Sequence, residues 1–283
     1  MFARLIAIGC ALLLLWGATP GALPSSTAPS STPLRMVSLN LAMREDIDTI
    51  AAELAERRLV PGADLVLLQE VIERDGGGDV ASRLAEKTGL HAVFRPAFAL
   101  DTHRTMGLAI LSREPLEEPH VLRLKQFDLS FRSRHRIALG VAIETPAGRI
   151  MVYNVHLDTR INIADRVEQL SAVMSDLDAS PDPVVVGGDF NTNDNLWLFH
   201  TIPIPFSSKQ RNGLLRFMKG KGFQSAITGH VATHDALGMQ LDWIFVRGLD
   251  AGSTAIQPMA ISDHHALVTT ISRPAPAQSA PGR

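Results

Sequence analysis

The sequence predicts an α/β or α+β domain with a substantial sheet, and three observations support this class. Segments with a strand pattern alternate along the chain with segments of helical period, as in mixed folds. Hydrophobic residues make up 46% and charged residues 20% of the chain, an ordinary balance for a protein with a packed core. The length of 283 residues permits one large domain or two small ones, and no second linker interrupts the central part.

Residues 1–22 are predicted to be a signal peptide. An apolar and small-residue run extends from Leu5 to Ala18, and it is too short to cross a bilayer comfortably. An uncleaved anchor or a buried first helix would show the same pattern, and Pro20 and Pro24 obscure the cleavage site. We expect a secreted protein, extracellular or periplasmic, with membrane anchoring by an uncleaved N-terminal segment as the alternative.

The single cysteine and the charge balance exclude several classes. Cys10 lies inside the apolar run, so a mature chain would hold no disulfide, thiol nucleophile or zinc–thiolate site. The formal net charge is −2 and the pI about 6.5, whereas proteins that bind bulk nucleic acid usually carry a basic excess.

Two polar segments bound the predicted domain. Residues 23–33 are rich in Ser, Thr and Pro and indicate a disordered linker, and residues 274–283 indicate a disordered tail. One domain over 34–273 is the simplest organisation.

The first elements of this domain are predicted from apolar spacing. Residues 34–41 and 65–68 are short apolar runs typical of strands, and residues 46–59 between them have a helical period. A polar residue stands where each strand ends, Asn40 near the end of the first and Glu70 after the second.

The second half continues the alternation. Residues 149–158 alternate, which places Asn154, His156 and Asp158 on one face of a strand, and residues 163–177 have the period of an amphipathic helix. The remaining predicted strands lie at residues 107–112, 137–144, 183–186, 241–246 and 266–271, with Gly187-Gly188 predicted as a turn that carries Asp189.

Polar residues suited to phosphate chemistry stand at the ends of these strands. Singly, a strand-end Asp is more often a turn residue, so only the combination is informative. The set holds four carboxylates, two amides and two imidazoles, and such hard ligands favour Mg²⁺, with Mn²⁺ or Ca²⁺ as alternatives. Its members are Asn40, Glu70, His156, Asp189, Asn191, Asp242, Asp263 and His264.

This set fits phosphate-ester hydrolysis, which needs a cation, a base for water and donors for phosphate oxygens. Other hydrolase classes fit less well. The chain has no G-x-S-x-G motif for a serine hydrolase and no H-E-x-x-H motif for a zinc peptidase.

Six short motifs follow one another along the predicted domain. They are Ser38-Leu39-Asn40, Leu68-Gln69-Glu70, Asn154-Val155-His156-Leu157-Asp158, Gly187-Gly188-Asp189-Phe190-Asn191, Leu241-Asp242-Trp243-Ile244 and Ser262-Asp263-His264. In this order they resemble the motifs of the endonuclease/exonuclease/phosphatase superfamily, and Gly-Asp-Phe-Asn followed by Ser-Asp-His is the most specific part. The resemblance implies a four-layer sandwich of two packed mixed β-sheets flanked by helices.

The resemblance also implies which residues hold the metal and the water. Glu70 would be the principal metal ligand, with Asn40 and Asp263 close to the metal or its waters. Asp189 would orient or deprotonate the attacking water, and Asn191 would hold that water or a phosphate oxygen.

Two imidazoles are implied at the phosphate. His264 would contact the phosphate and be oriented by Asp242, and His156 would be the second imidazole. The carboxylate behind His156 is not identifiable in the sequence. Asn154 and Asp158 share its strand face and are candidates for lining the substrate pocket.

The chain departs from the family pattern in two places. Leu108 stands where family members often carry an asparagine, so a substrate contact from that side chain is absent. The segment from Trp197 to Phe206 is unusually apolar for a position after Gly-Asp-Phe-Asn.

The sequence leaves three alternatives open for the substrate. The first is a nucleic acid, and the second is a lipid of sphingomyelin or phosphoinositide type or a small phosphate ester. The third is a phosphate ligand that the protein binds without catalysis. The apolar segment would contact a membrane. We expect a monomer without an obligate protein partner. The cations that would contact nucleic acid are the run from Arg132 to Arg136 and Lys209, Arg211, Arg216, Lys219 and Lys221.

Overall fold

The computed structural model describes residues 32–130, 133–146, 148–178, 180–205 and 207–274. The predicted signal peptide with Cys10, most of the predicted linker and tail, and Arg132 lie outside these residues. Within the described part, no helix has the length and apolar character needed to span a bilayer.

The first sheet has eight strands, and it runs β14-β16-β1-β2-β5-β4 with β15 beside β16 and β3 beside β2. Its strands are β1 (Leu34–Asn40), β2 (Leu65–Arg74), β3 (Gly78–Asp79), β4 (His91–Ala99), β5 (Arg104–Ser112), β14 (Asp250–Ala251), β15 (Ala255–Gln257) and β16 (Ala266–Ser272).

The second sheet has six strands in the order β12-β13-β9-β8-β7-β6. Its strands are β6 (Leu116–Arg123), β7 (Ile137–Thr145), β8 (Gly148–His156), β9 (Val184–Asp189), β12 (Gln224–Ser225) and β13 (Asp242–Arg247). A separate hairpin of β10 (Leu196–Leu198) and β11 (Ile202–Ile204) follows β9.

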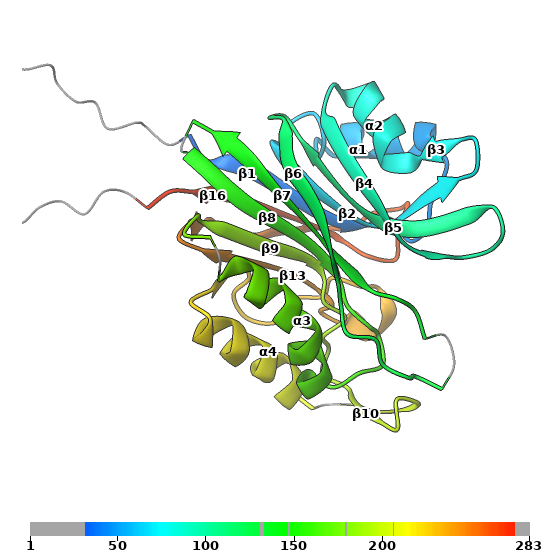
Figure 1. Cartoon of the computed structure of the whole chain (residues 1–283), viewed down its shortest axis with the longest axis vertical. Helices are drawn as coiled ribbons and strands as arrows, with labels where there is room; N and C mark the ends of the chain where they lie inside the picture. Colours follow the sequence, from blue (N-terminus) through cyan, green and yellow to red (C-terminus); the bar gives the residue numbers. More distant parts are fainter. Residues whose placement is uncertain (1–31, 131–132, 147, 179, 206, 275–283) are drawn as a thin grey trace, which may run out of the picture. The chain divides into compact units, whose positions relative to one another are not determined.

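Helices cover the outer face of each sheet, so the described domain has four layers (Figure 1). Helices α1 (Ile47–Glu56) and α2 (Val80–Thr88) pack on the first sheet, and α3 (Ile163–Leu177) and α4 (Lys209–Gly220) pack on the second. Along β2, Val66 and Leu68 face the helices while Leu65 and Leu67 enter the core between the sheets, which follows from the two-residue period of a strand. The predicted class and the four-layer arrangement are confirmed.

The strand directions bring the functional segments to one end of the sheets. Among the described ladders, β1 with β2 and β8 with β9 are parallel pairs, so Asn40 lies beside Gln69 in the first sheet and His156 beside Asp189 in the second. β13 runs antiparallel to β9 and begins with Asp242 opposite Asp189, where β9 ends. β16 runs antiparallel to β1, and the segment with Asp263 and His264 leads into it.

The predicted turn at Gly187-Gly188 is wrong, because both glycines lie inside β9. Gly188 has a φ of 131°, and a Cβ there would lie 2.2 Å from the carbonyl oxygen of Val155 on β8. A Cβ on Gly187 would lie 2.8 Å from Leu67 Cδ1 of the first sheet. The glycine pair therefore permits close packing beneath Asp189 instead of making a turn.

Candidate active site

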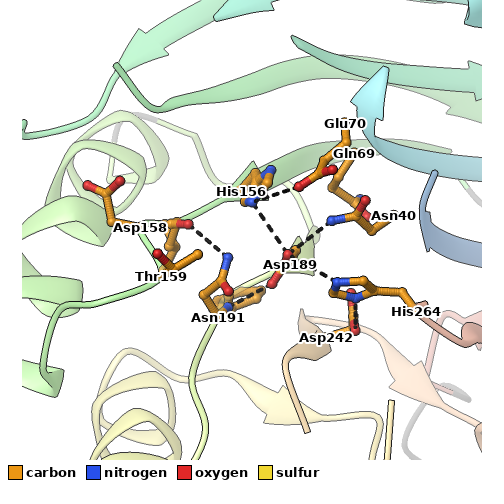
Figure 2. Close-up of polar contacts among 12 residues, drawn as sticks. Asn40, Gln69, Glu70, His156, Asp158, Thr159, Asp189, Asn191, Asp242 and His264 are labelled. Carbon is orange, nitrogen blue, oxygen red and sulfur yellow. Dashed lines mark hydrogen bonds and ion pairs between the residues drawn. The ribbon is translucent and has the colours of Figure 1, made fainter. Parts of the chain in front are cut away.

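Five side chains, four at or beside strand ends and one at an irregularity within β2, point toward one another between the two sheets (Figure 2). They belong to Asn40 of β1, Glu70 of β2, His156 of β8, Asp189 of β9 and His264 before β16. The structure thus joins residues that are up to 224 positions apart in the sequence (264 − 40).

Glu70 is turned toward this centre by an irregularity in β2. The register between β2 and β5 shifts between Leu68 and Val71, and Glu70 has a φ of 53°. This left-handed conformation is costly for a residue other than glycine and is typical of functional sites. One carboxylate oxygen, Oε1, lies 4.0 Å from Nε2 of His156.

Asp189 is the most connected carboxylate of the site. Its Oδ2 accepts a hydrogen bond from Asn40 Nδ2 at 3.1 Å and lies 3.4 Å from His156 Nε2. The same Oδ2 lies 3.9 Å from His264 Nε2. Its Oδ1 accepts a hydrogen bond from the backbone N–H of Asn191 at 2.8 Å. Two imidazoles and one amide therefore surround a single carboxylate that is 2% exposed.

Asp242 binds the ring nitrogen of His264 that faces away from the centre, as the resemblance implied. Its Nδ1 donates to Asp242 Oδ2 at 2.8 Å, and Thr233 Oγ1 donates to the same oxygen at 2.7 Å. Ser262 Oγ accepts the backbone N–H of His264 at 3.0 Å and donates to the carbonyl of Asn40 at 2.7 Å. The ring orientation is thereby fixed with Nε2 free to face the centre.

Burial and neighbouring charges shift the protonation of these groups. Burial raises the pKa of Asp189 to about 7, and burial also raises the pKa of Glu70. Burial lowers the pKa of His156 well below its usual 6.5. Burial acts in the same direction on His264, but the Asp242 carboxylate outweighs it and raises the pKa of His264 to about 10. One imidazole is therefore neutral and the other cationic near neutral pH.

Asn191 and Asp263 also make contacts that the implied roles do not include. The Nδ2 of Asn191 donates to the carbonyl of Leu157 at 3.0 Å, so this amide joins the loops after β8 and β9. The Asp263 side chain is 58% exposed, and its Oδ2 lies 3.3 Å from Nε2 of His234. The ring of His234 stands edge-on to that of His264, with centroids 4.6 Å apart.

Two groups of described residues could hold a metal ion, because their ligand atoms lie within 4.8 Å of one another. One group is Asp189, Asp242 and His264, and the other is His234, Asp263 and His264. Glu70 belongs to neither of these groups.

The structure corrects both substrate-pocket candidates, Asn154 on β8 and Asp158 two residues after the end of β8. Asn154 is fully buried, and its Nδ2 donates to the carbonyls of Leu68 and Ala109 across the sheet interface at 2.8 and 2.9 Å. Asp158 is 2% exposed and accepts from Arg136 Nε at 3.1 Å. Both side chains are committed to internal hydrogen bonds, so neither lines a substrate pocket.

Two buried arginines support the site and were not predicted. Arg136, expected in an exposed basic run, pairs with Asp158, and its charge acts on the pKa values of Glu70 and His156. Arg166 of α3 donates to the carbonyls of Asp158, Thr159, Ile161 and Phe190 at 2.6 to 3.2 Å. No local pattern distinguishes either residue from a surface arginine.

Leu108 is buried in the core between the sheets. With Arg136 and His156 it lines a small cavity of about 10 Å³. An apolar side chain therefore closes this flank of His156.

Comparison with known sequences identifies a family and two relatives. A model of the Endonuclease/Exonuclease/phosphatase family matches residues 37–264. A UPF0294 protein of Yersinia enterocolitica is 27% identical over 182 residues, which is 61% of this chain and 61% of that protein. A UPF0294 protein of Klebsiella pneumoniae is 25% identical over 218 residues, 74% of this chain and 72% of that protein.

Solved structures share the fold. An endonuclease/exonuclease/phosphatase protein from Beutenbergia cavernae has a TM-score of 0.69 at 22% identity, covering 85% of this chain and 72% of that chain. The human nocturnin catalytic domain has a TM-score of 0.62 at 19% identity, covering 85% and 93%. ANGEL2, a 2′,3′-cyclic phosphatase in complex with adenosine-2′,3′-vanadate, has a TM-score of 0.60 at 16% identity, covering 86% and 96%.

Proposed function

The chain belongs to the endonuclease/exonuclease/phosphatase family, and on this premise we propose that it is a divalent-metal-dependent phosphoesterase that hydrolyses a phosphodiester or phosphomonoester. The observation that carries the proposal is the Asp189 carboxylate, which faces His156, His264 and the Asn40 amide in one buried centre. A base between two imidazoles is suited to water attack on a bound phosphate.

The residues of the centre fit a divalent cation. Glu70 and Asp189 are carboxylates whose pKa values burial raises, and a nearby cation would relieve the cost of their charges. Glu70 and Asn40 would hold the ion, with Asp263 near its waters, and these oxygen ligands suit Mg²⁺, with Mn²⁺ or Ca²⁺ as alternatives. When bound, the ion would neutralise the charge that develops on the phosphate.

The remaining residues would act on water and phosphate. Asp189 would orient the attacking water and accept its proton, since Asn40 and the Asn191 backbone hold the carboxylate in place. His264, kept cationic by Asp242, would donate from Nε2 to a phosphate oxygen. His156 would donate to a second phosphate oxygen from the opposite side of Asp189.

Hydrolysis of bis-p-nitrophenyl phosphate in Mg²⁺, Mn²⁺ or Ca²⁺ tests the proposal. We expect turnover with at least one metal, its loss in EDTA, and a fall of about 100-fold or more in kcat for Asp189→Asn and His264→Ala. Asp178→Asn, at an exposed position after α3, is the matched control and keeps wild-type kcat. Full turnover by Asp189→Asn, or metal-independent turnover, would contradict the mechanism.

A lipid phosphoesterase is a second candidate, and the β10–β11 hairpin is the observation that favours it. Phe199 at its tip is 82% exposed and Ile202 is 55% exposed. Phe199 and His200 have φ angles of 50° and 56°, a turn that glycine or asparagine normally occupies. The chain thus tolerates strain to display an aromatic side chain. Trp197 does not share this exposure, since it is half-buried, and its backbone is bound by the Asn162 side chain.

Vesicle co-sedimentation tests this candidate. We expect wild-type protein to bind anionic vesicles and Phe199→Ser/Ile202→Ser to lose most of that binding. Val121→Ser is the matched control, since Val121 is an exposed aliphatic residue on β6. Equal sedimentation of the wild type and the double variant would reject the lipid candidate.

Several of the cations expected to contact nucleic acid are buried or lie away from the active centre. Arg136 is buried against Asp158. Lys219 and Lys221 lie where α4 ends, before β12, and β12 pairs with Phe245 and Val246 at the end of β13 remote from Asp242. A nuclease would have to use other contacts, and plasmid nicking with a steep salt dependence would support one.

We also propose export of the chain, on the basis of its N-terminal apolar run. Mass spectrometry of protein recovered from the extracellular or periplasmic fraction tests this. A mature N-terminus near residue 22 supports cleavage, whereas an intact N-terminus in the membrane fraction supports the anchor.

A further inference from the structure

A second concave site lies beside the active centre. A pocket of about 320 Å³ opens between the loop that follows β9 and the loop that precedes β13. Asn193 and Asn195 line it from the first loop, Met239 and Gln240 from the second, and Arg211 from α4. This volume is at the lower end of the range of small-molecule sites, about 300–1,000 Å³, so the pocket suits one compact chemical group.

Several polar atoms of this pocket lack hydrogen-bond partners among the described residues. Gln240 is 1% exposed, and its Oε1 accepts from the backbone N–H of Val231 at 3.3 Å while its Nε2 meets no acceptor. The buried Nε of Arg211 and Oδ1 of Asp194 are 3.7 Å apart, beyond hydrogen-bond distance. Asn193 Nδ2 reaches only the thioether of Met239, a weak acceptor, at 3.5 Å. Buried polar groups are normally paired, so this set is suited to a polar ligand.

The pocket adjoins the phosphate end of the active site. Asp189 and Asp242 lie opposite each other on β9 and β13, and Asn193 follows Asp189 by four residues while Gln240 precedes Asp242 by two. Thr233 connects the two sites, since its backbone N–H donates to the Met239 carbonyl at 2.9 Å and its hydroxyl donates to Asp242 at 2.7 Å. The loops that line the pocket are therefore continuous with the strands that carry Asp189 and Asp242.

We propose that the pocket receives the base of a nucleotide whose phosphate lies between Asp189 and His264. The inference rests on the proposed phosphoesterase function and assigns its substrate class. A base that carries an exocyclic amino group fits best, because the Asp194 carboxylate can accept from that group while Arg211 and Gln240 donate to ring nitrogens or carbonyl oxygens.

The walls favour a flat heterocycle over a lipid headgroup. Met239 and Pro205 supply apolar surface that can cover the faces of a ring. A quaternary ammonium headgroup is usually recognised by aromatic rings, and no Phe, Tyr or Trp is among the described residues that line this pocket. An inositol ring presents hydroxyls around its edge, so it would gain little from contact with the apolar wall.

Equilibrium binding in EDTA tests the inference without hydrolysis. Calorimetric titration of the full chain would compare adenosine, guanosine, cytidine and uridine monophosphates, as 3′ and 5′ isomers, with ribose 5-phosphate, phosphocholine and inositol 1-phosphate. We expect at least one amino-bearing nucleotide to bind about 10-fold or more tightly than ribose 5-phosphate, and more tightly than uridine monophosphate.

Two variants test whether the pocket causes the preference for a nucleotide over ribose 5-phosphate. Gln240→Leu should remove most of the preference over ribose 5-phosphate, and Asn195→Leu, at a half-buried position, should do the same if Gln240→Leu fails to fold. Lys219→Ala, at the far end of α4, is the control and should retain it.

Equal affinity for ribose 5-phosphate and every nucleotide would overturn the inference, as would retention of the preference by both leucine variants. If phosphocholine or inositol 1-phosphate bound more tightly than the nucleotides, and this binding depended on Gln240, the pocket would be a site for a lipid headgroup and the inference would be wrong. A base preference without hydrolysis of bis-p-nitrophenyl phosphate would contradict the proposed function alone, and hydrolysis without a base preference would contradict only this inference.

Discussion

His264 Nδ1 donates a 2.8 Å hydrogen bond to Asp242, while Nε2 of the same ring lies 3.9 Å from Asp189. The two carboxylates therefore lie on opposite sides of one imidazole ring. Asp189 belongs to β9 and Asp242 to β13, and these two strands pair with each other. Asp242 therefore fixes the direction of the ring and keeps it protonated, with Nε2 on the side of Asp189.

Removing the charge of Asp242 should impair this arrangement without changing its shape. We expect Asp242→Asn to lower kcat for bis-p-nitrophenyl phosphate by about 100-fold or more, because His264 loses the partner that keeps it cationic. Steady-state kinetics should show KM changed much less than kcat. Asp178→Asn serves as the control, and wild-type kcat in Asp242→Asn would contradict the role of the pair.

The stability of the metal-free protein should fall as pH rises from 7 to 10. The pKa of His264 is raised from 6.5 to about 10 in the folded chain. The contribution of this histidine to the free energy of unfolding is therefore complete below pH 6.5 and is lost as pH rises through about 10. One pKa unit corresponds to about 1.4 kcal/mol, which moves Tm by about 3–6 °C in a domain of this size. Thermal melts in EDTA at pH 7 and 10 measure the fall, and His264→Gln should show a smaller one.

Asp189 acts in a lower pH window. Its folded pKa of about 7 lies above its usual 3.8, so its contribution is lost between about pH 4 and pH 7 and adds little to the fall above neutrality. A fall between pH 7 and 10 that is as large in His264→Gln as in the wild type would therefore show that other groups cause it.

Divalent metal should stabilise the fold through Glu70. Binding to the native state alone adds about 2.7 kcal/mol at 100 times Kd, which raises Tm by about 5–10 °C. We expect this shift with Mg²⁺ or Mn²⁺ and its loss in Glu70→Gln. Glu86→Gln, on the exposed face of α2, is the matched control and should keep the shift. An equal shift in both variants would place the ion away from Glu70.

The strands that carry the site could be predicted because their signals are local. The apolar run over 65–68 and the alternation over 149–158 correspond to β2 and β8, and Glu70 and His156 meet as expected, although β2 continues past Glu70 to Arg74. α4 escaped prediction although Gln210, Leu214 and Met218 recur at helical spacing and are buried, because its many charges suggested a loop.

The supporting residues depend on contacts that no local pattern records. Arg136 belongs to a basic run, and only the tertiary structure buries it against Asp158. The β2 irregularity at Glu70 is likewise set by pairing with β5, which is remote in sequence. The pocket around Gln240 arises between two loops that the sequence separates by more than thirty residues.

Arg166 should be required for both stability and activity. Its guanidinium satisfies carbonyls of the loops after β8 and β9, and burial lowers its pKa to about 10. We expect Arg166→Met to cost about 3 kcal/mol in the free energy of unfolding, because buried carbonyls lose their donors. Urea unfolding measures this cost. Arg216→Met, at an exposed position of α4, should change it by less than about 0.5 kcal/mol.

Gly188 should tolerate no side chain. Its φ of 131° is strained for any other residue, and a Cβ would lie 2.2 Å from the Val155 carbonyl, so β8 and β9 would have to separate beneath Asp189. We expect Gly188→Ala to lower the free energy of unfolding by about 2 kcal/mol or more and to reduce kcat as well, since Asp189 is the next residue. Gly220→Ala is the matched control, because a Cβ there meets nothing within 4 Å and the residue ends α4. Urea unfolding and kinetics on both variants measure the difference, and an equally small effect of both substitutions would show that the strands can separate at no cost.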